Sequence, residues 1–286
     1  MFAHNNTLCN YVEMAIGAAA MAKHFLPETS VSLVTDESSM SKIPSAKMAQ
    51  IEELFEHIIL KEIDWNSDKE NIKVYKDTGY HQEKAEWHNT TRKSVYDLTP
   101  YDETVMIDTD YLIQSKCMDL VWGSEEDFRI NKDINYLNNT KTHDDQFLNP
   151  FSIPLYWATV VYFRKTERTR LLFDLIAHIQ ENYQYYKYMY KFKGDLYRND
   201  FSFSIAIHML AGFLENKEFN SLPFQYLASP DRDDLIQVKE NELKLLVGIP
   251  SESWSFTLIN VNGTDIHIMN KFSIGRHLDK ILELYL

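Results

Sequence analysis

Short apolar runs alternate with longer amphipathic segments through the first half of the chain. The short runs fit strands at residues 1–3, 31–34, 72–75 and 104–107. Apolar residues at helical spacing predict helices between these runs, over residues 11–26, 46–58 and 87–98. Asn10 is suited to cap the first helix because Glu13 follows three residues later, and Pro27 and Pro100 mark helix ends.

The second half of the chain is less regular, but its elements can still be predicted. A strand is expected over 157–163, and helices over 167–192, 200–214 and 279–286. The dipeptide Asn262-Gly263 is a turn signal, so segments 256–261 and 266–269 are predicted to form a β-hairpin. The sequence shows no internal repeat and no obvious linker, which favours one domain.

Strands that alternate with helices predict an α/β fold: a single, Rossmann-like domain over residues 1–286, with a mostly parallel central sheet flanked by helices. Such sheets place their ligands at the carboxyl ends of the strands. The loop after Ala3, the corner at Asp36 and the corner at Asp108 are therefore predicted to lie along one rim.

Composition and charge exclude several classes of protein. The chain has 286 residues and a formal net charge of −13, which opposes long-range attraction of nucleic acid. Its two cysteines, Cys9 and Cys117, lack the spacing of a disulfide framework or a zinc site, so a reduced, cytoplasmic location is expected. Residues 1–8 do not fit a signal peptide, and the apolar stretch 12–21 is too short to span a bilayer. A soluble protein without a membrane partner is expected, and its oligomeric state stays open.

The segment Val105-Met-Ile-Asp108-Thr109-Asp110 is an apolar strand that ends in two carboxylates at positions i and i+2. Alternate side chains of a strand point to the same side, so both carboxylates can approach one ion. Divalent cations such as Mg²⁺ and Mn²⁺ prefer oxygen ligands and share sites with substrate phosphates. Such triplets also occur by chance as solvated turn residues, so this pattern alone leaves both interpretations open.

Three segments together resemble the GT-A glycosyltransferases, especially the retaining enzymes similar to glycogenin and to lipopolysaccharide galactosyltransferases, and also the glycosyltransferases of T4-like bacteriophages and cyanophages. The first segment is the start of the chain, from Phe2-Ala3-His4-Asn5-Asn6-Thr7 to Ser32-Leu-Val-Thr-Asp36. The second is the region from Arg92 to Asp110, and the third is Ile266-His267-Ile-Met-Asn-Lys271. The order and spacing of the three segments fit over most of the chain.

The resemblance implies roles for several residues in the second and third segments. Asp108 and Asp110 would bind the metal, with His267 as a third protein ligand. An imidazole ligand favours Mn²⁺ over Mg²⁺. Lys271 would contact the donor diphosphate, Thr109 would lie against the donor, and Arg92 would lie over its phosphates or sugar. For His267 and Arg92, a solvent-facing strand or helix position is the alternative.

Other contacts to the donor follow from the first segment and from a helix start in the second half. The loop that contains Ala3, Asn5 and Thr7 would wrap the base and ribose, and Asp36 would be a further contact or merely a helix cap. Asp200, at the start of a helix, would hold the donor sugar beside its anomeric carbon or else serve as an N-cap. His143-Asp144-Asp145 fits a solvated loop or a lid on the acceptor side.

The implied activity is glycosyl transfer from a nucleotide sugar, expected to be UDP-linked, to an acceptor hydroxyl. The nucleotide-binding part would cover about residues 1–125, and the acceptor-side part about residues 126–286. The acceptor could be a carbohydrate, a protein or a hydroxymethylated base in phage DNA, with the host cytoplasm as the location in the last case. Retention and inversion stay open.

Two other classes of function compete with glycosyl transfer. A nucleotidyltransferase or sugar-nucleotide pyrophosphorylase would use similar metal chemistry, but the glycine-rich loop expected there is missing from residues 4–10. The third possibility is a catalytically silent binding protein with the same fold. The presence of Asp108, Asp110 and His267 argues against it.

Overall fold

The computed structural model describes residues 1–63, 71–149, 151–216, 219–249 and 255–286. In the first half of the chain the helices are α1 (Tyr11–Phe25), α2 (Glu37–Ser41), α3 (Ser45–Leu54), the 3₁₀ helix η1 (Thr90–Ser94), α5 (Val95–Leu98) and the 3₁₀ helix η2 (Cys117–Val121). The strands of this half are β1 (Ser32–Thr35), β2 (His57–Leu60), β3 (Ile72–Asp77), β4 (His81–Glu86), β5 (Glu103–Ile107), β6 (Tyr111–Leu112), β7 (Phe128–Asn131) and β8 (Ile134–Tyr136).

The second half contains the 3₁₀ helix η3 (His143–Asp145) and the helices α6 (Glu167–Glu181), α7 (Tyr183–Tyr190), α8 (Asn199–Leu210) and α9 (Lys271–Tyr285). Its strands are β9 (Trp157–Arg164), β10 (Tyr226–Ser229), β11 (Asp234–Lys239), β12 (Glu242–Gly248), β13 (Phe256–Asn262) and β14 (Ile266–Ile268). No helix among the described residues is long and apolar enough to cross a membrane.

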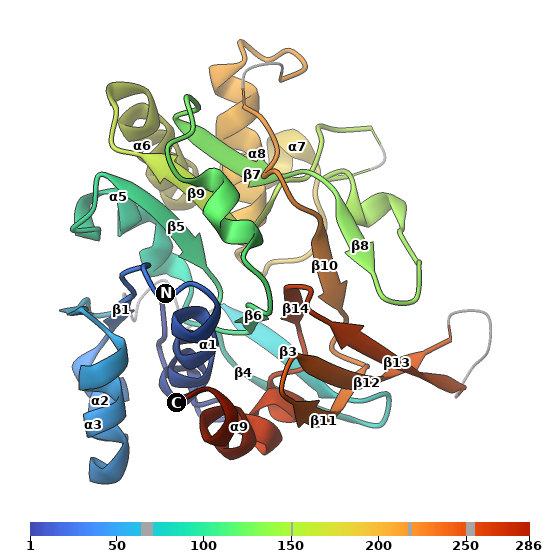
Figure 1. Ribbon diagram of the computed structural model, residues 1–286. Coiled ribbons are helices and arrows are strands. Elements are labelled where there is room, and N and C mark those ends of the chain that lie inside the picture. Colours follow the sequence, from blue (N-terminus) through green and yellow to red (C-terminus); the bar gives the residue numbers. More distant parts are fainter. Residues whose placement is uncertain (64–70, 150, 217–218, 250–254) are drawn as a thin grey trace.

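The architecture is mixed α/β, with helices packed around several small sheets (Figure 1). Strands β5, β9 and β7 form one sheet with β9 in the middle, and helices α6 and α8 pack against each other beside it. A second sheet has the order β6-β14-β10-β8. Helices α1 and α9 lie side by side although they come from opposite ends of the chain (Figure 1).

The predicted mostly parallel central sheet is not confirmed. Strand β1 pairs in parallel with β2, and β10 pairs in parallel with β14 and β8. The remaining pairs among the named strands are antiparallel: β11–β12, β12–β13, β14–β6, β3–β4, β5–β9 and β7–β9. The prediction assumed a helical crossover between successive strands, whereas β3–β4 and β11–β12 join sequence neighbours directly, which antiparallel pairing allows.

The start of the chain forms as predicted. Asn10 is the N-cap of α1: its side-chain oxygen accepts from the Glu13 backbone N–H at 3.1 Å, and its amide donates to the Glu13 carboxylate at 2.9 Å. The first contact satisfies a backbone N–H that a helix start otherwise leaves unpaired, and the second joins the two side chains. Phe2 forms a parallel bridge with Val34, so residues 1–3 lie beside β1.

Several predicted helices have different bounds. The helix predicted over 46–58 ends at Leu54, and residues from His57 on form β2. The helix predicted over 87–98 begins only at Thr90, with a 3₁₀ turn. The helix predicted over 167–192 is divided at Asn182, which is the C-cap of α6 and the N-cap of α7.

The predicted hairpin over 256–269 is wrong. Gly263 does adopt the positive φ of a turn, at 57°. However, β13 pairs with β12, whereas β14 pairs with β10 and β6 in a different sheet. The turn signal described local backbone conformation correctly, but the partners of both strands come from elsewhere in the chain. The final helix also begins earlier than predicted, at Lys271, where Asn270 caps it.

Candidate active site

The Asp108-Thr109-Asp110 segment forms a tight turn between β5 and β6. The Asp108 N–H donates to Thr159 O at 3.0 Å and so extends the β5–β9 ladder by one residue. The Tyr111 N–H closes the turn on Asp108 O at 3.1 Å, and the Ile268 N–H donates to Asp110 O at 2.9 Å. The backbone on both sides of the turn is thus bound to neighbouring strands, and Thr109 is buried within it.

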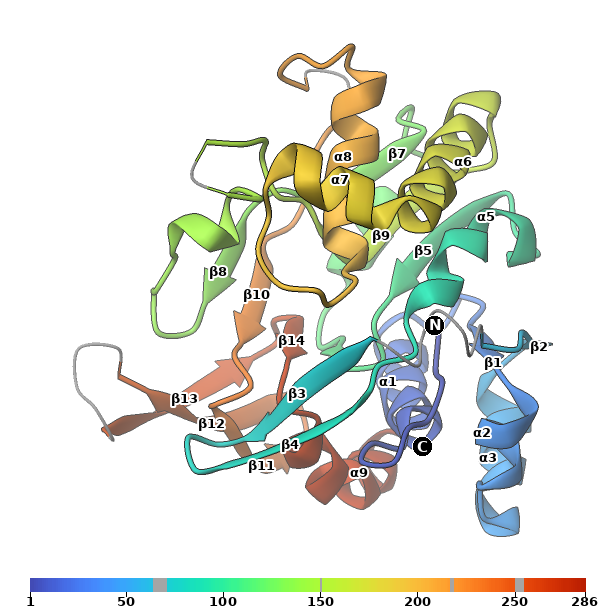
Figure 2. The ribbon, with the colours of Figure 1, turned by 180° about the vertical axis from the view of Figure 1, so that it is seen from behind.

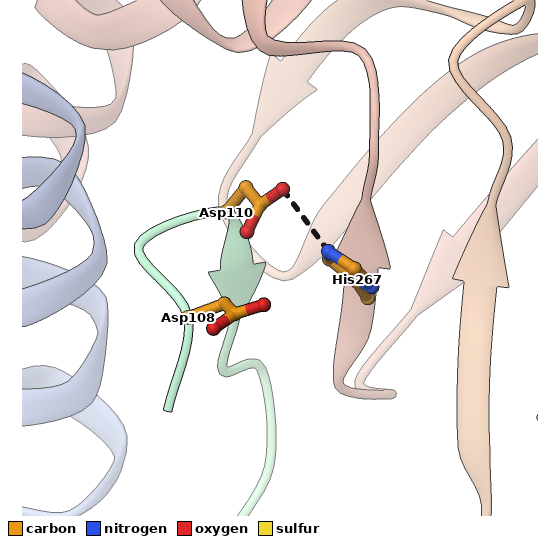
Figure 3. A group of neighbouring side chains, drawn as sticks. All are labelled: Asp108, Asp110 and His267. Carbon is orange, nitrogen blue, oxygen red and sulfur yellow. Dashed lines mark hydrogen bonds and ion pairs between the residues drawn. The ribbon is translucent and has the colours of Figure 1, made fainter. Parts of the chain in front are cut away.

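His267 reaches this turn through the pairing of β14 with β6, in which it lies opposite Tyr111. Its Nε2 is 3.0 Å from Asp110 Oδ2, and Figure 3 shows the ring directed at the Asp110 carboxylate with Asp108 beside it. One ligand atom from each of Asp108, Asp110 and His267 lies within 4.8 Å of the others. The three residues predicted as metal ligands are therefore brought together.

The other ring nitrogen of His267 is held by two hydroxyl groups. Tyr226 Oη lies 2.6 Å from His267 Nδ1 and donates its own proton to Thr159 Oγ1 at 2.9 Å. The Tyr226 oxygen can then accept from a proton on Nδ1. In the metal-free arrangement Nε2 can donate to Asp110 Oδ2, and a metal ion would take the place of that proton while the Tyr226 contact keeps Nδ1 protonated.

Two cations flank the carboxylates. Arg92, from η1, places Nη1 2.5 Å from Asp108 Oδ1, and Lys271, the first residue of α9, places Nζ 2.5 Å from Asp110 Oδ2. Burial opposes ionisation of Asp110, but the charges and hydrogen bonds of His267 and Lys271 hold its pKa well below the ordinary value. Burial raises the pKa of Asp108, and the Asp110 charge adds to this rise against the opposing charge of Arg92.

The donor set fits a divalent cation on two observations. Asp108 Oδ1 is sealed from solvent and receives no hydrogen bond from any residue that the structure describes, because the approach of Arg92 lacks hydrogen-bond geometry. Opposite ligands of Mg²⁺ lie about 4.2 Å apart, so atoms within 4.8 Å of one another need only a small adjustment to bind one ion. In the present arrangement Lys271 supplies the positive charge beside Asp110.

Asp200 lies in the first turn of α8, but its carboxylate contacts other protein groups. One oxygen accepts from the Ala158 N–H at 2.9 Å, and the other accepts from Arg198 Nε at 3.1 Å and from an Arg198 terminal nitrogen at 2.8 Å. The Arg198 guanidinium also lies 5.6 Å from the Trp157 ring centroid. The N-cap itself is Arg198 rather than Asp200.

The loop after the first strand has its polar groups largely engaged within the fold. Ala3 uses its N–H and its C=O to pair with Val34 and Thr35. The Asn5 side chain accepts from the Val12 N–H at 3.0 Å and donates to Ser39 O at 3.4 Å, so it joins α1 to α2. Thr7, by contrast, is exposed. The structure therefore leaves Thr7 the freest of these three side chains to meet a ligand.

Asp36 follows β1 as predicted and is the N-cap of α2. Its oxygens accept from the Ser39 N–H at 2.9 Å, from Ser39 Oγ at 2.6 Å and from His4 Nδ1 at 3.0 Å. Although burial opposes ionisation, the bonds from His4 and Ser39 lower the pKa of Asp36 below its ordinary value. The cap interpretation of Asp36 accounts for these contacts.

Two cavities differ in their relation to the carboxylates. An apolar cavity of about 360 Å³ lies between β1 and β5, and its lining includes Leu26, Val31 and Met106 but none of the three candidate ligands. A cavity of about 460 Å³ is lined by Cys9, Glu13 and Lys271, among others. We associate the second cavity with the site because its lining residue Lys271 contacts Asp110.

Sequence reasoning missed the residues that orient His267. Tyr226 is separated from it by 41 positions and Thr159 by 108, so no local spacing could reveal either contact. Arg198 was missed as the partner of Asp200, although the two are only two residues apart. An Arg-x-Asp pair before an apolar helix was the available signal.

No family model matches the chain, and no curated protein sequence matches it. Among solved structures, the chain is similar to the glycosyltransferase GlyE of Streptococcus pneumoniae TIGR4, with 12% identity and a TM-score of 0.44. The match covers 77% of this chain and 43% of GlyE, so the chain spans less than half of that protein's length. It is also similar to apo mouse xyloside xylosyltransferase 1, with 17% identity and a TM-score of 0.42 over 78% of this chain and 83% of the other. Likenesses this loose do not bear on activity, which has to follow from the side chains of the site.

Proposed function

We propose that the chain is a metal-dependent glycosyltransferase of the GT-A type, which transfers a sugar from a nucleotide-sugar donor, expected to be UDP-linked, to an acceptor hydroxyl. The observation that supports this is the convergence of Asp108, Asp110 and His267, with Arg92 on one side and Lys271 on the other. Three side chains that can bind a divalent metal ion, with the positively charged side chains of Arg92 and Lys271 beside them, suit a diphosphate bound to that metal.

Each residue has a distinct task in this proposal. Asp108, Asp110 and His267 Nε2 would hold Mn²⁺ or Mg²⁺, which as a Lewis acid would stabilise the departing diphosphate. Lys271 would exchange its contact with Asp110 for one with a phosphate oxygen, and Arg92 would contact the donor from the other side. Both cations then offset charge that grows as the bond to the sugar breaks.

The donor sugar is assigned to the space near Asp200. Asp200 accepts from the Ala158 N–H, and the next residue, Thr159, accepts from the Asp108 N–H, so Asp108 and Asp200 both lie beside the first residues of β9. Arg198 holds the Asp200 carboxylate in a fixed orientation. Residues 1–125 would supply most nucleotide contacts, including Ala3, Asn5, Thr7 and Thr109, whereas the Asp36 carboxylate caps α2. Residues 126–286 would supply the acceptor side.

The acceptor hydroxyl belongs to a carbohydrate, a protein or a hydroxymethylated base in phage DNA. The net charge of −13 weighs against the DNA acceptor, whereas the sequence resemblance to phage enzymes favours it. A panel with one acceptor of each class, assayed with the same labelled donor, identifies the class by which product carries the label. The configuration of the new bond then decides between retention and inversion.

Thermal unfolding with UDP, with Mn²⁺ and with both together tests the donor site. At a hundredfold excess over Kd, we expect UDP and Mn²⁺ together to raise Tm by about 5–10 °C, and we expect Asp110→Ala to abolish the rise. Asp97→Ala is the matched control because Asp97 is an exposed carboxylate whose ion pair with Arg170 lies on the surface. No joint effect of UDP and Mn²⁺ on the parent protein would overturn the UDP assignment.

A donor screen by sugar-nucleotide hydrolysis tests the reaction itself. A glycosyltransferase releases the nucleoside diphosphate and free sugar, whereas a pyrophosphorylase supplied with pyrophosphate releases the nucleoside triphosphate. Release of nucleoside diphosphate from one sugar nucleotide, lost in Asp108→Ala, is the expected result. Formation of a triphosphate, or no turnover of any donor, contradicts the proposal in favour of the two competing functions.

A further inference from the structure

Strand β3 presents Lys73, Tyr75 and Asp77 on the face that packs against the rest of the molecule. The strand alternates, since Ile72 and Val74 are exposed whereas Tyr75 is buried. Tyr75 Oη accepts from the Asn6 side-chain amide at 2.8 Å, and Asp77 forms ion pairs with α9. In Figure 2 the β3–β4 hairpin lies across α9 and near α1, so its inward face meets the elements that carry Lys271 and the first loop.

Lys73 is a half-buried ammonium whose described contacts are aromatic rings. Its Nζ lies 4.3 Å from the Trp87 ring centroid and 5.4 Å from that of Tyr75. Among the described residues, its Nζ forms no ion pair and no hydrogen bond. The residue is partly exposed, so its side chain is not sealed within the core. Lysines are rarely buried without an anion, because desolvation of the charge is costly.

The charges that act on Lys73 include those of the candidate active site. Burial, followed by the nearby charge of Lys271, lowers the pKa of Lys73 to about 7; Arg198 acts in the same direction as Lys271, whereas Asp110 and Asp231 act in the opposite direction. Strand β3 also packs against α9, which begins at Lys271, so the two lysines belong to elements in contact. A bound anion would stabilise the unpaired charge of Lys73.

We propose that Lys73 contacts the diphosphate of the donor from the β3–β4 hairpin, as a second lysine opposite Lys271. The inference rests on the proposed glycosyltransferase function. A phosphate oxygen would supply the hydrogen-bond acceptor that the ammonium lacks, and the ring faces of Trp87 and Tyr75 would hold the side chain in place. The hairpin therefore belongs to the donor site, with Lys73 as its contact residue.

The first test measures the Kd of UDP with saturating Mn²⁺ by calorimetry in Lys73→Met and Lys73→Arg. We expect Lys73→Met to weaken binding about 10–100-fold, and Lys73→Arg to keep most of the affinity because the charge remains. Lys84→Met is the matched control, since Lys84 is an exposed lysine on the neighbouring strand β4. Equal affinity in Lys73→Met and Lys84→Met would overturn the proposal.

A second measurement uses the unmodified protein, so it does not depend on a variant that folds. Acylation of Lys73 by an amine-reactive reagent near pH 7.5, followed by peptide mass spectrometry, should be slowed severalfold by UDP with Mn²⁺, while Lys84 reacts at an unchanged rate. If the protein binds UDP and Lys73 is not protected, the inference fails and the proposed function stands. If UDP does not bind but inorganic pyrophosphate protects Lys73, the anion site stands and the UDP assignment fails. If the protein binds neither UDP nor pyrophosphate, and neither ligand protects Lys73, both the inference and the UDP assignment fail.

Discussion

The part of the chain that the structure describes contains two buried aspartate–histidine pairs of equal length, Asp36–His4 and Asp110–His267, each with 3.0 Å between nitrogen and oxygen. At the first pair, three hydrogen bonds from His4 and Ser39 satisfy both carboxylate oxygens. The second pair has another carboxylate beside it, that of Asp108.

The two pairs differ in whether their carboxylate oxygens all have hydrogen-bond partners. The His4 ring donates or accepts on both sides, to Asp36 and to Thr91 Oγ1 at 3.0 Å, and the Asp36 carboxylate caps a helix. The other corner has two carboxylates, and the buried Oδ1 of Asp108 has an ion pair with Arg92 but no hydrogen bond from a described residue. An aspartate after an apolar strand therefore marks a corner of the fold, but a ligand site needs a surplus of unsatisfied groups.

Replacing each aspartate by asparagine gives the largest expected contrast between the pairs. Asp110→Asn should lower sugar-nucleotide hydrolysis at least about a hundredfold, since loss of a direct metal ligand should cost no less than loss of a group behind one. Asp36→Asn should lower Tm through loss of the α2 cap and of the His4 pair, but should keep the joint response to UDP and Mn²⁺. Calorimetry with Mn²⁺ and UDP checks both variants, and a lost response in Asp36→Asn would show that the Asp36 pair also serves the site.

Lys271→Met tests the cation beside Asp110, which the Asp36 pair lacks. Burial lowers the pKa of Lys271, but the Asp110 carboxylate in contact with it has the larger, opposite effect. The pKa of Lys271 is therefore raised, and the residue stays charged. We expect kcat/KM for donor hydrolysis to fall about a hundredfold, which corresponds to about 3 kcal/mol of lost transition-state stabilisation. Mn²⁺ should still bind, because Asp108, Asp110 and His267 remain. Failure of Mn²⁺ binding in this variant would instead make Lys271 a structural partner of Asp110.

The contrast between the two corners also shows how much the sequence could predict. The apolar run over 104–107 and the two carboxylates after it located the corner correctly, because burial and charge are local properties. Whether a carboxylate is already satisfied depends on distant partners, such as Ser39 for Asp36 and Lys271 for Asp110. The sequence therefore placed the candidate ligands but could not decide between a donor contact and a helix cap for Asp36, which the structure shows as a cap.

The elements of the fold also divide into those that neighbouring residues predict and those that depend on distant partners. The cap at Asn10 and strand β9 were predictable from neighbouring residues. Strand β4 was missed because its residues His81–Glu86 are nearly all polar and exposed, so it carries no apolar alternation. The pairing of β14 with β10 and β6 is a choice among distant partners, and a turn signal at Asn262-Gly263 does not reveal it.

The pH dependence of stability should also differ between the two pairs, by a smaller amount. The folded pKa of Asp36 is depressed, so its contribution to stability is present above the unfolded pKa of about 3.9 and is lost as pH falls through the folded value. At the other corner the pKa of Asp110 is depressed but that of Asp108 is raised, so the two contributions oppose each other. Between pH 5 and pH 3, Tm of the metal-free protein should therefore fall less steeply in Asp36→Asn than in the parent, whereas Asp108→Asn should not flatten the decline. Parallel curves for Asp36→Asn and the parent would contradict the Asp36 assignment.

The smallest expected effect comes from the hydroxyl that orients His267. Tyr226→Phe removes the partner of His267 Nδ1 but keeps the ring, which stacks 5.9 Å from the imidazole between centroids. With its tautomer no longer selected, His267 should bind the metal about tenfold more weakly, and added Mn²⁺ should restore most of the hydrolysis rate. The Mn²⁺ concentration at half-maximal activity measures this shift, and Tyr156→Phe, which also loses one tyrosine hydroxyl bond but at Asn216, is the control. An unchanged Mn²⁺ requirement in Tyr226→Phe would mean that Asp110 alone orients the imidazole, and His267 would then resemble His4 more closely than its place beside two carboxylates suggests.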